Sequence, residues 1–153
     1  TTPLLGEAHR DVLGNAMNIA VLNGRIGNDD AALDASRRLH DVAGRVLAPH
    51  DAMRAAALEG MASALVRLAR AAEALPLCQQ AVQIRTAHGV AADIARARVC
   101  MADAYLGLGR PDLAVVEARA AEQIATATLG PSHPDRARYQ EVVATCEARM
   151  RAR

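Results

Sequence analysis

Small and apolar residues return along the chain with a period of about 40 positions. Residues 61–70 read MASALVRLAR and residues 101–110 read MADAYLGLGR, so one pattern of small and large apolar positions occurs twice. A small residue marks the same place in four successive copies, at Ala20, Ala62, Ala102 and Ala144. A period of this length predicts repeated units that bury their apolar stripes by stacking on one another.

Each unit is predicted to hold two helices, because long helix-compatible stretches alternate with turn residues. Gly109 lies just past the end of one stretch, and Pro111 stands where the first turn of a helix tolerates proline. The second unit has Ala69 in place of that glycine. We expect helices near residues 11–26, 29–47, 51–69, 71–88, 93–108, 111–128 and 135–151. The expected N-caps are the aspartates Asp11, Asp51, Asp93 and Asp135.

The fold class expected is all-α, an α-α superhelix (a solenoid) of about three and a half helical hairpins and seven helices. Residues 1–153 are expected to form a single domain with units at about 11–50, 51–92, 93–134 and 135–153. Residues 129–135 read LGPSHPD and residues 5–11 read LGEAHRD, which predicts two equivalent loops. Since the chain opens inside such a loop, we expect it to be a piece of a longer protein.

The composition supports closely packed helices. Alanine supplies 36 of 153 residues, Phe and Trp are absent, and Tyr occurs twice, a balance that is poor in strand-forming residues. All 18 basic residues are arginine, and 17 acidic residues leave a net charge of +1, so charge predicts no nucleic-acid partner. No apolar run approaches the ~20 residues that span a bilayer, so we expect no membrane partner.

The cysteines and histidines form no catalytic or metal-binding pattern. Cys78, Cys100 and Cys146 lie far apart with no CxxC, which favours reduced thiols in a cytoplasmic protein, with Cys100 the most exposed. His9 and His133 lie in the two matched loops and are expected to form hydrogen bonds that fix the turns. We therefore expect no enzyme activity, no metal and no cofactor.

The pattern resembles the tetratricopeptide repeat (TPR), in the longer form found in kinesin light chains and many bacterial signalling proteins. The resemblance covers nearly the whole chain and is carried by the linker at 129–135 and by Ala102, Tyr105, Gly109, Ala114 and Ala121. It implies a right-handed superhelix whose first helices line a concave groove for a peptide or a partner protein. The Lys and Asn positions with which chaperone-binding members hold a terminal carboxylate are not matched here, which argues against a co-chaperone role.

The groove that the resemblance implies can be assigned to residues by taking the small alanines as inward positions. The expected contact residues are Met17, Asn18, Val21, Arg25, Glu59, Ser63, Arg67, Arg96, Val99, Asp103, Arg138, Glu141 and Thr145. A ligand with an apolar group near Met17 and carboxylates near Arg96 and Arg138 would fit. The alternative is that these arginines are solvated or paired with Asp103 and Glu141.

The function expected is a non-enzymatic protein–protein interaction module of a bacterial signalling or transcription-regulatory protein. The alternative is a peptide-sensing regulatory domain that controls an attached effector. Self-association through the ends of the solenoid is a third expectation, because a solenoid end has no stacking neighbour.

Overall fold

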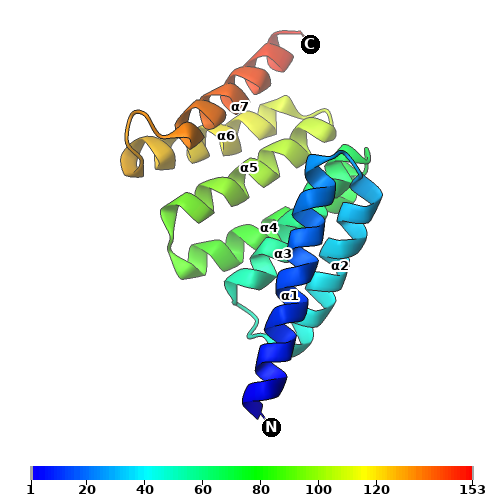
Figure 1. The fold of residues 1–153 in the computed structure, drawn as a ribbon. Helices are drawn as coiled ribbons and strands as arrows, with labels where there is room; N and C mark the ends of the chain where they lie inside the picture. Colours follow the sequence, from blue (N-terminus) through cyan, green and yellow to red (C-terminus); the bar gives the residue numbers. More distant parts are fainter. Residues whose placement is uncertain (1, 153) are drawn as a thin grey trace.

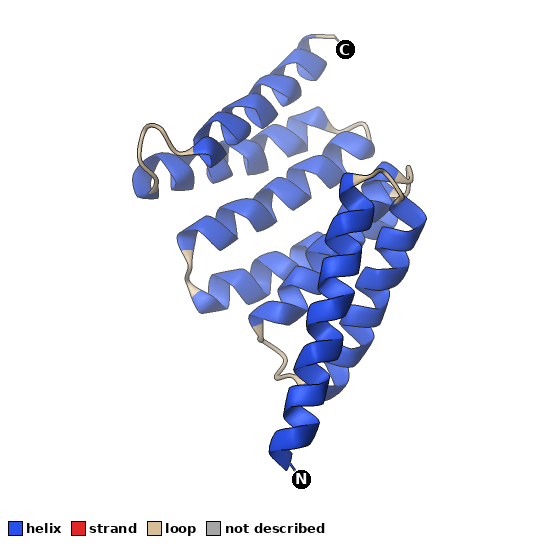
Figure 2. Ribbon diagram, viewed as in Figure 1, coloured by secondary structure: helices blue, strands red, loops and turns tan. Residues whose placement is uncertain are grey.

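The computed structural model describes the backbone of residues 2–152 and the side chains of residues 11–152. In this part of the chain every regular element is a helix, as the all-α prediction requires, and Figure 2 shows the short loops that join the helices. The helices are α1 (Thr2–Arg25), α2 (Asp29–Val46), α3 (Ala52–Arg67), α4 (Ala71–His88), α5 (Ala91–Gly107), α6 (Pro111–Thr128) and α7 (Pro134–Arg151).

The bounds of α2 to α7 agree with the sequence prediction to within two residues, but the start of α1 does not. The segment 5–11 was expected to be a loop, and it lies inside α1. In its counterpart, residues 129–133 form a loop because Pro131 and Pro134 keep the residues before them out of a helix, and α7 begins at Pro134. Residues 5–11 carry no proline, so the helix runs through them and the two segments are not equivalent.

The caps follow the prediction at one aspartate. Asp51 caps α3, and its carboxylate accepts a hydrogen bond from the Met53 amide at 2.9 Å. The cap of α7 is instead His133, whose Nδ1 accepts from the Asp135 amide at 3.2 Å. The expected hydrogen bond of His133 is thus confirmed, whereas Asp135 is not the cap. Asp93 lies in the first turn of α5, Asp11 lies within α1, and His9 lies within α1 instead of a loop.

The helices form two layers. Each helix packs against the next in sequence, and the first helices of the units, α1, α3, α5 and α7, also contact one another in order. In the described part of the chain, the second helices α2, α4 and α6 make no such contacts with one another. The array therefore curves with the first helices on its inner side, and Figure 1 shows the N- and C-terminal ends at opposite ends of the stack.

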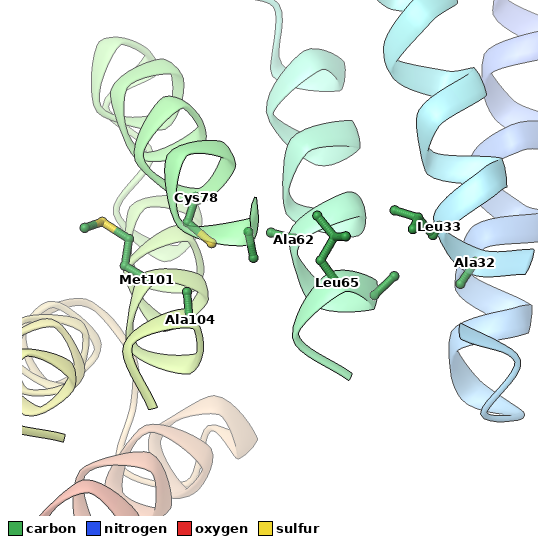
Figure 3. Packing of buried hydrophobic residues seen from close by; sticks show 9 residues of the cluster. Ala32, Leu33, Ala62, Leu65, Cys78, Met101 and Ala104 are labelled. Carbon is green, nitrogen blue, oxygen red and sulfur yellow. The ribbon is translucent and has the colours of Figure 1, made fainter. Parts of the chain in front are cut away.

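Alanine lets these layers approach closely. Ala62 and Ala102 on the first helices and Ala74 on a second helix are fully buried. Figure 3 shows how side chains from α2, α3, α4 and α5 meet in one of the core clusters. The repeat position is less buried at the ends: Ala20 is partly buried and Ala144 is exposed. Among the described residues the fourth unit has no second helix of its own to cover Ala144, so the prediction of a buried position fails there.

Two of the three cysteines are joined, which corrects the prediction of reduced thiols. Cys78 on α4 and Cys100 on α5 form a disulfide with a Cα–Cα distance of 5.6 Å, and Cys146 is free and buried. The two lie 11 residues before and after Gly89, whose φ of +74° turns the chain between antiparallel helices. Because both cysteines are equally far from the turn, they lie at the same height on the two antiparallel helices. The cytoplasmic location stays a prediction, and the cysteines no longer support it.

Within residues 2–152, no helix is long and apolar enough to cross a membrane.

Candidate binding groove

Two adjoining cavities lie on the inner layer of the array, and we call them together the groove. The first, of about 520 Å³, lies between α1, α2 and α3 and reaches Arg96 on α5. The second, of about 430 Å³, lies between α3, α5 and α7. Four residues line both cavities, which makes the groove continuous: Glu59, Ser63, Arg67 and Arg96.

The groove collects most of the residues that the sequence predicted. The first cavity also contains Met17, Val21 and Arg25, and the second also contains Val99, Asp103 and Arg138. Three predicted residues line neither cavity: Asn18, Glu141 and Thr145. The hydroxyl of Thr145 donates to the Glu141 carbonyl of its own helix at 3.0 Å.

The sequence analysis missed a charged groove residue because it comes from a second helix. Arg85 on α4 reaches into the first cavity, although the prediction took groove residues only from first helices. Its side chain is 11% exposed and binds Glu59 through two hydrogen bonds, Nε to Oε1 at 2.9 Å and Nη2 to Oε2 at 3.3 Å. Its Nη1 lies 3.7 Å from Asp93 on α5.

This pairing continues into a chain of four charges across three helices. Asp93 is also bound by Arg96, so Glu59, Arg85, Asp93 and Arg96 alternate in sign and balance. Burial disfavours the charged form of Arg85, but the hydrogen bond and charge of Glu59, with the charge of Asp93, outweigh it and raise the pKa of Arg85. Arg96 thus pairs with Asp93, and the expected pairing with Asp103 or Glu141 is not found for it.

Arg67 is also held by the protein itself. Its Nε donates to Asp29 on α2 at 2.5 Å, and its Nη1 donates to the Ser63 hydroxyl at 2.6 Å. The arginine joins the second unit to the start of α2 and leaves the floor between the two cavities close to neutral.

Asp103 and Arg138 differ from these pairs. Both line the second cavity, and neither forms a salt bridge or a side-chain hydrogen bond with any described residue. Burial raises the pKa of the Asp103 carboxyl, and the charge of Arg138 lowers it in part. This end of the groove therefore holds one acid and one base whose hydrogen-bonding atoms remain available.

The apolar end of the groove lies on α1. Met17 is partly buried and Val21 is 48% exposed, and both border the larger cavity beside Gly24.

Among the described residues, no group of three or more His, Cys, Asp or Glu side chains could hold a metal ion.

Comparison with known proteins gives similarity in structure but not in sequence. No protein-family model and no curated protein sequence matches the chain. A TPR-like protein from Chlorobium tepidum is similar over 98% of this chain and 99% of its own, with a TM-score of 0.78 and 22% identity. A Podosopora anserina protein, described as kinesin light chain nearly identical TPR-like repeats, has a TM-score of 0.80 and 21% identity. The match covers 90% of this chain and 66% of that one.

These similarities agree with the array of stacked helical hairpins described above. The chain therefore has the fold of the TPR-like repeat proteins, an all-α superhelix of stacked helical hairpins.

Proposed function

We propose that the groove binds an extended peptide or a segment of a partner protein and that the domain acts as a non-enzymatic interaction module. The observation that carries this proposal is the pair of adjoining cavities along α1, α3, α5 and α7. A ligand lying along them would contact apolar side chains on α1 and unpaired charges near α7.

The unpaired charges at the α7 end, Asp103 and Arg138, define the chemistry of the ligand there. Because Arg96 is already neutralised by Asp93, the carboxylate contact that the sequence suggested falls to Arg138 alone. Asp103 beside it suits an ammonium or guanidinium group, since a half-buried carboxylate gains most from a donor that also carries positive charge. We therefore propose a ligand with a basic and an acidic group close together and an apolar side chain directed to Met17 and Val21.

The setting that we propose, on the resemblance alone, is a bacterial signalling or regulatory protein in the cytoplasm. A reducing compartment would open the Cys78–Cys100 bond, so this setting requires that the groove also binds when the bond is open. The peptide-sensing alternative uses the same groove and predicts a short free peptide as the natural ligand.

The test is selection of peptides from a random displayed library on the immobilised protein, followed by calorimetric titration of the selected peptides. We expect Arg138→Glu and Val21→Glu to weaken binding at least tenfold, because each removes its own contact in the groove. The control is Arg45→Glu, an exposed arginine of α2 that lines neither cavity.

Peptides that bind both groove variants as tightly as the unchanged protein would refute the proposal. A selected free peptide that raises the melting temperature strongly by mass action would favour the peptide-sensing role. Selection that recovers no binding peptide would count against both.

A further inference from the structure

The outward face of α1 carries an apolar stripe that nothing in the described structure covers. Val12, Ile19 and Leu22 are 43%, 44% and 59% exposed, and Ile26, just beyond the helix end, is 76% exposed. Their spacings of seven, three and four residues put them on one side of the helix. The groove lies on another side, where Met17 and Val21 border the first cavity.

The repeat register identifies this stripe as an inter-unit contact surface. On α5 the residues equivalent to Ile19 and Leu22 are Met101 and Ala104, which are 9% and 0% exposed. On α7 they are Val143 and Cys146, which are 8% and 0% exposed. In α5 and α7 this face lies against the second helix of the preceding unit, α4 or α6. The same face of α1 has large apolar side chains and no neighbour among the described residues.

As far as residue 152, the opposite end of the array offers no matching surface. The large apolar residue exposed on α7 is Met150, at 41%, and the other exposed positions of this helix are polar, charged, alanine or the initial Pro134. The side of each second helix that faces the next unit is already covered: α3 packs on α2, α5 on α4 and α7 on α6. Head-to-tail stacking of two copies would therefore leave the α1 stripe against a polar surface.

We propose that a second copy of this chain covers the stripe, with the two α1 helices antiparallel about a two-fold axis near Ile19. In that arrangement Ile19 lies against Ile19 of the other copy, and Val12 of each copy lies level with Ile26 of the other. Both copies use the same patch in this contact, so the assembly is complete as a dimer and does not extend further.

Charge supports the antiparallel direction. Asp11 and Arg25 lie on the same flank of the stripe, near its two ends, and both are exposed. Residues on the same flank face each other when two helices run antiparallel, so Asp11 of each copy comes near Arg25 of the other. Neither side chain forms a salt bridge with any described residue of its own chain. The dimer thus gains two ion pairs at its rim.

The first experiment measures mass against concentration by sedimentation equilibrium. We expect the unchanged chain to dimerise and Ile19→Glu to raise the dimer dissociation constant at least ~100-fold, because a carboxylate is then buried on both sides of the axis. Val116→Glu is the matched control, since Val116 is exposed on α6 and lies outside the stripe. Circular dichroism verifies that each variant keeps its helices.

The second experiment tests the direction by exchanging charges. Asp11→Arg and Arg25→Asp should each weaken the dimer, and the double variant should restore it. A cysteine in place of Ile19 should cross-link two copies on oxidation, whereas a cysteine in place of Val116 should not.

A chain that is monomeric at all concentrations overturns the proposal, as does a dimer that tolerates Ile19→Glu. Failure of the double charge variant to recover overturns the antiparallel arrangement. If a longer form with a further hairpin before Thr2 is monomeric while this chain dimerises, that hairpin is the natural occupant and the proposal is wrong. None of these outcomes depends on peptide binding in the groove.

Discussion

At the scale of residues, the turns inside the three hairpins show one motif with one substitution. Gly27, Gly109 and Ala69 occupy equivalent positions, and their φ angles are +79°, +72° and +61°. In each turn the next amide donates to a carbonyl five residues back, at 2.8 or 2.9 Å, which is the hydrogen bond of a Schellman cap. Ala69 is therefore held in a left-handed conformation that its Cβ disfavours.

We predict that Ala69→Gly raises the free energy of unfolding by about 1 kcal/mol, because glycine adopts this conformation without steric strain. Chemical denaturation measures the change. The reciprocal control is Gly109→Ala, which should lower stability by a similar amount. If both substitutions destabilise the protein, the turn of the second unit is not equivalent to that of the third.

The sequence could predict such positions wherever a local signal suffices. The alignment of Ala69 with Gly109 predicted the position of that turn, and Asp51 was recognised as a cap. The sequence could not predict which arginines of the groove form ion pairs within the protein. Arg96 pairs with Asp93 of its own helix, and Glu59 pairs with Arg85 of a neighbouring helix. Pairing of this kind depends on how helices are placed in space, which the repeat pattern does not contain.

At the scale of elements, the small residue midway along each first helix decides how closely the helices approach. Ala102 is fully buried in a cluster with Ala114, Val115 and Val143, so no space exists for a longer side chain. Ala144 has the same place in its unit but is exposed, because among the described residues no second helix of that unit follows α7. The two alanines thus separate the effect of packing from that of helix propensity.

We predict that Ala102→Leu lowers the free energy of unfolding by roughly 1–3 kcal/mol through overpacking. Ala144→Leu changes it by less than ~0.5 kcal/mol, because an exposed helical alanine and leucine differ little. Thermal and urea unfolding of both variants provide the comparison. Equal losses for the two would mean that the helix register assigned to the repeats is wrong.

Most element boundaries could be predicted because glycine and proline mark them in the sequence. The N-terminal end of α1 could not, since the similarity of residues 5–11 to a loop concealed the absence of the prolines that make that loop. The disulfide was also missed, although Cys78 and Cys100 are equally far from the turn at Gly89. Equal distance from a predicted turn between antiparallel helices is the signal that could have found it.

At the scale of the whole molecule, contacts join only near neighbours, and no packing contact connects the two ends of the described chain. The second and third units are held together mainly by the α4–α5 junction, where the disulfide adds a covalent link to the ion pair of Arg85 with Asp93. A break at this junction would divide the array into two parts, each with a smaller core. The junction therefore governs whether the domain unfolds as one body.

We predict that the double substitution Cys78→Ala and Cys100→Ala lowers the free energy of unfolding by roughly 3 kcal/mol, the value expected for a closed loop of this length. Dithiothreitol should have a similar effect on the unchanged protein and none on the double variant. Melting in both conditions is followed by circular dichroism. A melting curve of the unchanged protein that is insensitive to the reductant would contradict the prediction.

The chain of near-neighbour contacts gives the domain the mechanics of a spring. A slight rotation at each junction adds along the stack, so its pitch can change considerably while every local interface stays intact. The covalent link between α4 and α5 stiffens the junction between the second and third units, near the middle of the array. Bending of the array is then concentrated in the units on either side of this link. These units carry the apolar and the charged ends of the groove.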